Sequence, residues 1–247
     1  MKNKIKLHHT KYLPILFLLA APTICTSCFP TKQKKEHLLI FTGGHPFERK
    51  AFFKIFDDMP NVEYREAAHP NANHLYASSL IDSIDVLVFY DMVQEINDTE
   101  KADFIALLNK GKGIVFLHHS LVNYQEWDEY ENIIGGHYYL SFKNRDSSTY
   151  KHDVDIPVKI LDKKHPVTKG IEDFIIHDEV YGNFKVLPIV HPLLSTTHPE
   201  SGEIIGWTNK YGKSRIVYIQ LGHDRRAYEN PNYRRLVKQA IDWVQKK

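Results

Sequence analysis

The chain has 247 residues, which is enough for one substantial α/β domain or for two small ones. Its 43% hydrophobic and 25% charged residues are typical of a globular protein and argue against a disordered one. The formal net charge is only +2, and the basic residues form no stripe of the kind that binds nucleic acid. Nucleic acid is therefore excluded as a partner.

The first 28 residues have the features of a lipoprotein signal peptide. Lysines precede the apolar run 12–21, and residues 1–27 contain no acidic side chain. The run is shorter than the roughly 20 apolar residues of a membrane-spanning helix, and it fits the apolar region of a signal peptide. Small residues precede Cys28, so we predict that Cys28 is lipidated; Cys25 is the weaker candidate. A plain secretory signal cleaved nearby is the alternative.

This signal predicts a location in the cell envelope. Lipid on Cys28 would anchor the protein to a membrane, on the periplasmic side or at the outer-membrane surface, with residues 29–36 as a polar tether. Both cysteines lie in the signal segment, so the domain expected over residues 37–247 has none. That domain therefore lacks a thiol nucleophile, a disulfide and a cysteine-ligated metal.

The first half of this domain alternates between strand and helix patterns. Unbroken apolar runs indicate strands buried on both faces, as in parallel sheets. Asn97 and Glu100 have the spacing of a capping box, at the start of a helix that runs to Leu108. This alternation predicts an α/β fold with a doubly wound, mostly parallel sheet. The strands are expected at 37–42, 62–67, 85–90 and 114–118, and the first helix at 46–58.

The second half adds strands of another kind. Apolar and polar residues alternate in 154–160, which indicates a half-exposed, antiparallel strand. Asp178 and Glu179 fall between the patterns and are expected in a loop. The segment has no long linker, so we predict one domain with antiparallel additions in its C-terminal half. Further strands are expected at 186–194, 203–208 and 215–221, and an amphipathic helix at 232–245.

Polar residues gather where the predicted core strands end. Ligands of open α/β sheets bind beyond the carboxyl ends of the strands, so these positions are informative. Three of the four ends carry histidine, which predicts a cleft where imidazoles distant in sequence meet. The four ends are Gly43-Gly44-His45, Tyr90-Asp91, His118-His119-Ser120 and Gly222-His223-Asp224.

Each of these residues also has a structural interpretation. Gly44 and His45 would then serve only a turn and a helix start, and Asp224 would pair with a neighbouring arginine. Neighbouring residues of a regular strand point to opposite faces, so only one of His118 and His119 is expected to reach the cleft.

The ordered set of motifs resembles the ThuA-like (trehalose-utilisation) family. The match spans roughly residues 38–245, and the whole set is more specific than any single motif. The resemblance implies a fold like that of class I glutamine amidotransferases, with a flavodoxin-like sheet. The motifs are Gly43-Gly44-His45, Gly111-Lys112-Gly113, His118, Trp127, Tyr130, Gly135-Gly136-His137, His165-Pro166-Val167-Thr168, Asp178-Glu179-Val180-Tyr181 and Gly222-His223-Asp224.

The resemblance also bears on the nucleophile. Class I glutamine amidotransferases carry a cysteine at the sharp turn after a central strand, whereas this turn reads His118-His119-Ser120. Because the domain has no cysteine, thiol-based glutamine hydrolysis is excluded. Ser120 would need an adjacent base and an oxyanion hole to replace the thiol, so a Ser120-based hydrolase is the weakest alternative.

A cluster of histidines and carboxylates can still act in two ways. It can bind a divalent metal such as zinc, or it can perform metal-free acid–base chemistry. We expect His118, Glu179 and His223 to be catalytic, with Asp178 and Asp224 orienting them. The expected metal ligands are His45, His118, His137, Glu179 and His223.

The resemblance implies a role in sugar metabolism, because members of the family often accompany dehydrogenases that make 3-keto sugars. The expected ligand is a small carbohydrate, a glycoside or a 3-keto sugar, and the expected enzyme is a keto-sugar isomerase or lyase, or a hydrolase. The alternative is a lipid-anchored module that binds carbohydrate without catalysis. The expected substrate-binding residues are Gly44, Tyr90, Asp91, His119, Ser120, Trp127, Tyr181 and Asp224, with Tyr138 as a further aromatic side chain.

Overall fold

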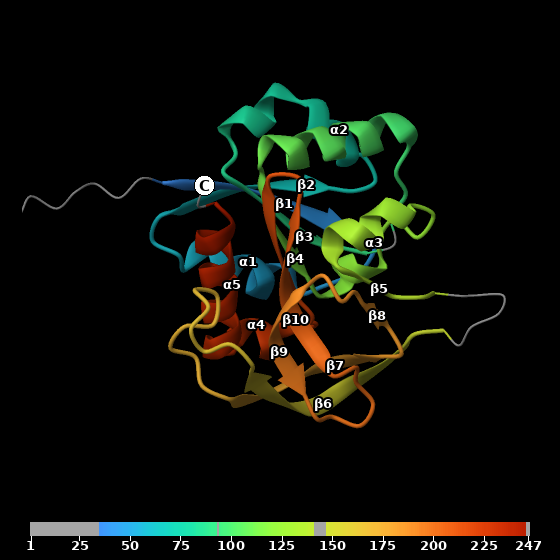
Figure 1. The fold of residues 1–247 in the computed structure, drawn as a ribbon. Helices are drawn as coiled ribbons and strands as arrows, with labels where there is room; N and C mark the ends of the chain where they lie inside the picture. The colour runs from blue at the N-terminus through green and yellow to red at the C-terminus, as the bar shows by residue number, and fades with distance from the viewer. Residues whose placement is uncertain (1–34, 93, 141–146, 246–247) are drawn as a thin grey trace, which may run out of the picture. The chain divides into compact units, whose positions relative to one another are not determined.

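The computed structural model describes residues 35–92, 94–140 and 147–245 (Figure 1). The predicted signal peptide with Cys28, and the tether up to residue 34, lie outside the described residues. In the described part of the chain, no helix is both long and apolar enough to cross a membrane.

One nine-stranded sheet organises the fold (Figure 1). Its parallel half has the strand order β2-β1-β3-β4-β11, and antiparallel strands continue it in the order β10-β9-β6-β7. This is a mixed α/β fold with a large, mostly parallel core. The parallel strands are β1 (Glu36–Gly43), β2 (Val62–Ala68), β3 (Val86–Asp91), β4 (Gly113–Leu117) and β11 (Ser214–Ile219). The antiparallel strands are β6 (Thr149–Ile160), β7 (Phe174–Gly182), β9 (His191–Thr196) and β10 (Ile204–Tyr211). A separate pair joins β5 (Gly136–His137) to β8 (Lys185–Val186).

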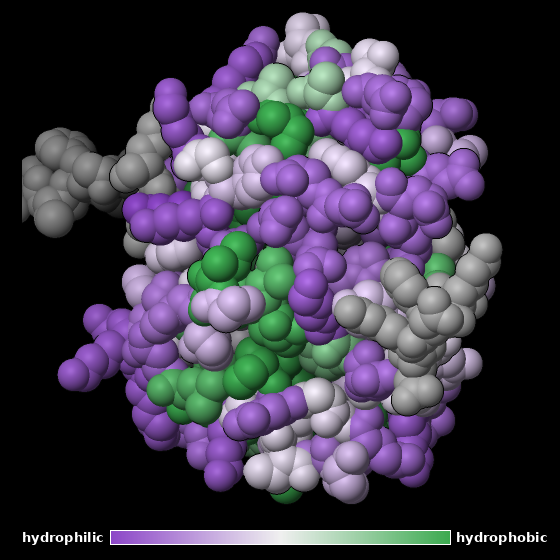
Figure 2. Space-filling view, turned by 45° about the vertical axis from the view of Figure 1, so that its right-hand side comes forward, coloured by the Kyte–Doolittle hydropathy of each residue, from purple (hydrophilic) through white to green (hydrophobic). Residues whose placement is uncertain are grey.

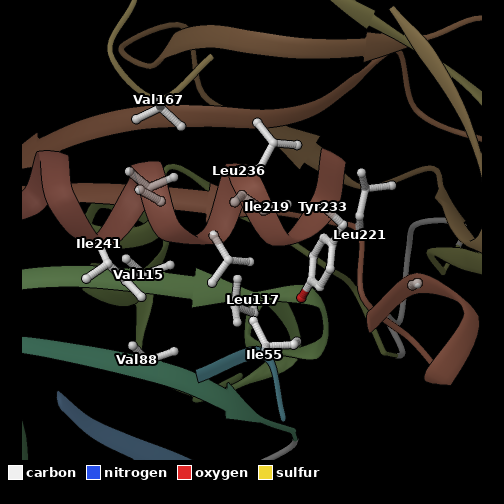
Figure 3. Packing of buried hydrophobic residues seen from close by; sticks show 14 of the residues in the cluster. Ile55, Val88, Val115, Leu117, Val167, Ile219, Leu221, Tyr233, Leu236 and Ile241 are labelled. Atoms are coloured by element: carbon white, nitrogen blue, oxygen red, sulfur yellow. The ribbon is translucent and has the colours of Figure 1, made fainter. Parts of the chain in front are cut away.

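Helices cover both faces of the parallel half. Along β1, Leu38 and Ile40 pack in the cluster that includes α1, α4 and α5, whereas Leu39 and Phe41 pack in the cluster that includes α2 and α3. Figure 3 shows Leu236 of α5 lying against the sheet in the first cluster. Alternate burial on two faces explains why these strands are apolar throughout. The helices are α1 (Arg49–Asp57), α2 (Asp98–Lys110), α3 (Asp128–Ile134), α4 (Arg225–Glu229) and α5 (Pro231–Val244).

Most predicted elements of the parallel half are confirmed to within one residue. The predicted strands at 37–42, 62–67, 85–90 and 114–118 correspond to β1 to β4. The capping box of α2 is also present, because Asn97 accepts the backbone N–H of Glu100 at 3.0 Å and Glu100 accepts that of Asn97 at 2.9 Å. Gly111, with φ of 88°, ends the helix in the left-handed conformation that glycine allows.

Two predictions about the second half are wrong. The strand expected at 186–194 is interrupted, because Pro188 lacks the N–H that a ladder needs and residues 187–190 form a turn between β8 and β9. Asp178 and Glu179 do not lie in a loop but in β7, whose buried positions include polar side chains. The helices α3 and α4 were not predicted.

The surface of the described residues is mainly hydrophilic, with apolar side chains gathered in one band of the face in Figure 2. Five large hydrophobic side chains in the described residues are exposed, namely Leu140, Tyr150, Leu161, Ile175 and Ile189. Two of them border the candidate site described next.

Candidate functional site

The chain turns sharply where β4 ends, and this turn brings two imidazoles to one place. His118 has φ of 47° and starts a 3-10 helix, η3 (His118–Val122), instead of continuing the strand. Strand alternation therefore no longer applies. The expectation that only one of His118 and His119 reaches the cleft is wrong, because both approach the carboxylate of Glu179.

Glu179 of β7 is the centre of the site. Its Oε2 lies 2.8 Å from His118 Nε2, 2.9 Å from His223 Nδ1 and 3.9 Å from His119 Nε2. Its other oxygen, Oε1, lies 3.4 Å from His152 Nδ1. The carboxylate is buried, so its charge is met by imidazoles rather than by bulk solvent.

The tautomer of His118 follows from its second ring nitrogen. Nδ1 lies 2.5 Å from the carbonyl oxygen of Gln220, which can only accept, so Nδ1 must carry a proton. In the neutral ring Nε2 is then an unprotonated acceptor, and it faces a carboxylate oxygen at 2.8 Å. Two acceptors at this distance repel one another unless a proton or a cation lies between them. A backbone carbonyl that fixes the ring through Nδ1 is also a typical arrangement behind a metal-binding histidine.

Asp178 holds the turn that presents His223. Its carboxylate accepts the backbone N–H of Gly222 at 2.7 Å, of His223 at 2.9 Å and of Glu179 at 2.9 Å. The hydroxyl of Tyr90 also stabilises this turn, because it donates a hydrogen bond to the Gly222 carbonyl at 2.9 Å. One buried carboxylate thus fixes the backbone of two residues of the cluster.

The pKa values of the cluster reflect burial and mutual contact. Burial opposes the charged form of Glu179, but its contacts with the His118 and His223 rings outweigh burial and hold the pKa of Glu179 well below its usual range. Burial also opposes protonation of His223, and its hydrogen bond with Glu179 raises the pKa of His223 nevertheless. Burial and the nearby His118 lower the pKa of His119, and burial lowers the pKa of His45, so both favour the neutral ring.

Four of these side chains could hold a metal. His118, His119, Glu179 and His223 each offer one atom, and these atoms lie within 4.8 Å of one another. Ligand atoms of a tetrahedral zinc ion are about 3.3 Å apart, given metal–nitrogen distances of about 2.0–2.1 Å. The observed separations of 2.8, 2.9, 3.2 and 3.9 Å bracket that value, so small side-chain adjustments would admit the ion. The three imidazoles and one carboxylate are ligands that zinc accepts.

Two residues of the cluster, His119 and Glu179, line a cavity of about 210 Å³. His45 lies in this cavity with its ring stacked on His119 at 4.4 Å, beside the four possible ligands rather than among them. Its Nδ1 is buried and has no hydrogen-bond partner in the described part of the structure. The cavity is lined by His45, Met92, His119, Val122, Tyr138, Leu140, Tyr150, His152, Glu179 and Tyr181.

Gly44 is required by the backbone beside His45. Its φ is 79°, and a Cβ atom added there would lie 1.8 Å from the carbonyl oxygen of Met92. No other residue fits this close crossing of the segments after β1 and β3. Gly44 therefore shapes the cavity through its lack of a side chain.

Several predicted site residues lie away from the cluster. Asp91 is fully buried and pairs with His69, Oδ2 to Nε2 at 3.0 Å. Ser120 is fully buried, with its hydroxyl 2.8 Å from the carbonyl of Phe89. Trp127 lines a neighbouring hollow of about 500 Å³, which shares Leu140 with the cavity.

Two more predicted residues also stand apart from the four possible ligands. His137 is a member of β5, and its Nδ1 lies 4.0 Å from a carboxylate oxygen of Glu131. Asp224 caps α4 and accepts hydrogen bonds from Arg226, as its structural interpretation anticipated. Of the predicted aromatic residues, Tyr138 and Tyr181 line the cavity, and the Tyr181 hydroxyl lies 3.1 Å from His118 Nε2.

Sequence reasoning missed five residues of the cavity, namely the apolar Met92, Val122 and Leu140 and the polar Tyr150 and His152 of β6. The strand was expected only from residue 154, because the alternating pattern starts there and residues 149–153 are polar. In the structure this polar segment belongs to β6 and pairs with β7, and a β-bulge between Lys151 and Val154 separates it from the alternating part of the strand. The spacing of Tyr150 and His152 could have identified these two, because they are two residues apart and alternate residues of a strand share one face.

Comparison with known proteins gives the family. The family model described as ThuA, trehalose utilisation, matches residues 37–244. None of the curated proteins compared with the chain matches it in sequence.

Solved structures agree in fold. A ThuA-like protein from Parabacteroides merdae is 16% identical with a TM-score of 0.73, covering 86% of this chain and 91% of that one. A ThuA-like protein from Bacteroides uniformis is 18% identical with a TM-score of 0.68, covering 88% and 94%. β-Galactosidase from Bacillus circulans is 9% identical with a TM-score of 0.57, covering 85% of this chain and 31% of that one. On the match of the family model over residues 37–244, the chain belongs to the ThuA, or trehalose utilisation, family.

Proposed function

We propose that this protein acts on a small carbohydrate, a glycoside or a 3-keto sugar, through a metal-assisted site centred on Glu179. Membership of the trehalose utilisation family supports a carbohydrate-related role. The main observation in favour of a bound metal is that two hydrogen-bond acceptors, Glu179 Oε2 and His118 Nε2, lie 2.8 Å apart. A proton would satisfy that pair alone, whereas the approach of His223 Nδ1 and His119 Nε2 to the same carboxylate oxygen favours a cation.

The strand order supports this location. The parallel strands follow the order β2-β1-β3-β4, which supports a flavodoxin-like arrangement of the sheet. Such sheets bind ligands beyond the carboxyl ends of β1 and β3, where the strand order reverses. His45 follows β1, so it belongs to this crevice in the proposal.

The residues of the cavity suit chemistry beside a carbonyl group. His118, His119, Glu179 and His223 would hold a divalent cation, which when bound supplies Lewis-acid polarisation of a substrate oxygen. His45 keeps a neutral ring with a buried, unpartnered Nδ1, so it is placed to take the acidified proton beside the carbonyl of a 3-keto sugar. In a 3-keto-glycoside, loss of the proton at C2 drives electrons into the C1–C2 bond while the C1–O bond breaks. The departing oxygen takes up a proton, from the imidazolium of His45 or from water, so the products are an unsaturated keto sugar and the free alcohol.

Replacement of His223 by alanine is expected to lower kcat/KM for methyl 3-keto-glucoside by about 100-fold or more, because it removes one metal ligand from a partly buried site. The assay follows sugar product formation by the zinc-loaded mature protein. The control is His191→Ala, an exposed histidine that pairs with Asp162 on another part of the surface.

Two results would contradict the enzyme proposal. Turnover that survives His223→Ala would show that the reaction occurs elsewhere. Binding of the glycoside by the wild type without any turnover would favour the carbohydrate-binding module instead.

We also propose that Cys28 carries a lipid anchor in the cell envelope. The support is the sequence alone, with lysines, an apolar run and small residues before the cysteine. In the producing bacterium, Cys28→Ala is expected to shift the protein from the membrane fraction to the soluble or unprocessed fraction, as measured by fractionation and intact mass. Cys25→Ala serves as the matched control, and loss of anchoring in that variant alone would move the assignment to Cys25.

A further inference from the structure

Strand β6 builds the outer wall of the cavity beside Glu179. Lys151 pairs with Val180 and Val154 pairs with Asp178, so His152 and Asp153 together oppose the single residue Glu179. This is a β-bulge, a feature that re-aims side chains and is common beside functional sites. It leaves His152 with its Nδ1 3.4 Å from Glu179.

Aromatic rings then lead from the cluster to the mouth of the cavity. The ring of His152 lies 4.5 Å from that of His223, and the ring of Tyr150 lies 5.0 Å from that of His152. Tyr150 pairs with Tyr181 across the strands and therefore shares its face of the sheet. Tyr181 is buried against His118, whereas Tyr150 is 62% exposed at the outer end. The wall thus has an inner and an outer tyrosine.

The cavity is too small for an extended ligand. Its volume of about 210 Å³ lies below the roughly 300–1,000 Å³ of pockets that enclose a drug-sized ligand, so it suits a single small ring. With one sugar ring in the cavity, a second ring would lie outside it. Tyr150 lines the cavity and is also exposed to solvent, so it lies at the boundary where a group outside the cavity could contact it.

We propose that the cavity takes one terminal sugar ring, and that Tyr150 stacks on the group attached to that ring. Tyr150 is then a specificity-determining residue that distinguishes glycosides by their second group. This inference rests on the proposed carbohydrate function. It adds that the ligand is held by its terminal unit, with the glycosidic bond at the mouth of the cavity.

The test uses two glucosides that lack the 3-keto group, so that neither reacts by elimination during the measurement. Methyl β-D-glucopyranoside fills only the cavity, and 4-nitrophenyl β-D-glucopyranoside adds an aromatic group. Titration calorimetry of the zinc-loaded mature protein is expected to give about fivefold tighter binding of the nitrophenyl glucoside, as one aromatic contact provides. Tyr150→Ala should remove this preference, so that the two glucosides bind with the same affinity.

Tyr150→Phe keeps the ring and should keep the preference, and Ile175→Ala is the control for loss of an exposed apolar side chain elsewhere. Equal affinity of the wild type for the two glucosides, or a preference that persists in Tyr150→Ala, would overturn the inference while the proposed function stands. Failure of the wild type to bind either glucoside would also overturn the inference, whereas the proposed function fails only if methyl 3-keto-glucoside is neither bound nor turned over.

Discussion

Replacement of Glu179 by glutamine is expected to lower the zinc affinity of the mature protein by at least about 100-fold. The carboxylate oxygen is the atom around which three imidazole nitrogens gather, at 2.8, 2.9 and 3.9 Å. Glutamine keeps the size but removes the negative charge, and its amide is a much poorer zinc ligand. Even partners that only orient metal ligands change affinity by 10–100-fold, so loss of a ligand should cost more. Competition with a chromophoric chelator at pH 7.5, on protein without a histidine tag, measures the effect.

Glu131→Gln is the matched control for this experiment. Glu131 is a half-buried carboxylate that also faces an imidazole, that of His137, but it is not one of the four residues of the cluster. Its replacement should leave one equivalent of zinc bound with unchanged affinity. If the wild type takes up no zinc, the acceptors Glu179 Oε2 and His118 Nε2 share a proton, and the metal proposal fails.

The parallel half of the fold could be predicted because local pattern and tertiary burial agree there. Every residue of β3 (Val86–Asp91) is buried, so an unbroken apolar run reports the strand directly. The capping box at Asn97 and Glu100 is local in sequence and needs no tertiary information. Where local and global signals coincide in this way, sequence reasoning succeeds.

Strand β7 shows why the rest of the site could not be predicted. Its residues 177–179 are polar, and Asp178 and Glu179 are nevertheless buried, because their hydrogen-bond partners come from segments distant in sequence. A pattern of polar residues predicts a loop unless those partners are known. Local rules fail most often at functional sites, where burial serves chemistry rather than the core.

The backbone conformation near the site is a second reason why its residues could not all be predicted from the sequence. The positive φ of His118 ends the strand earlier than an apolar run can indicate, and it brings His119 to the same cluster. The bulge opposite Glu179 likewise breaks the alternation that would have identified His152. His137, in contrast, matched a family motif but lies beside Glu131. The sequence pattern therefore predicted that the site lies at the carboxyl ends of the core strands. Which side chains meet there depends on the backbone conformation, which the pattern does not reveal.

Asp178→Ala is expected to lower the free energy of unfolding by about 3–5 kcal/mol. The side chain is 2% exposed and accepts three backbone N–H groups, those of Gly222, His223 and Glu179, at 2.7–2.9 Å. Alanine leaves these donors buried without a partner, and each such group costs about 1–3 kcal/mol. Urea unfolding should show a lower midpoint with an unchanged slope, since the same surface is exposed on unfolding.

Asp155→Ala is the control, because Asp155 is an exposed carboxylate of β6 that pairs with His177 at the surface, so its loss should leave the stability nearly unchanged. An Asp178→Ala variant within about 1 kcal/mol of the wild type would show that other contacts hold the turn. Asp178→Asn adds a sharper comparison, since it keeps the shape but places an amide donor among N–H groups. Its loss of stability should be accompanied by weaker zinc binding, because the same carboxylate fixes the backbone of His223 and Glu179. Stability of the turn and geometry of the metal site are therefore expected to fall together.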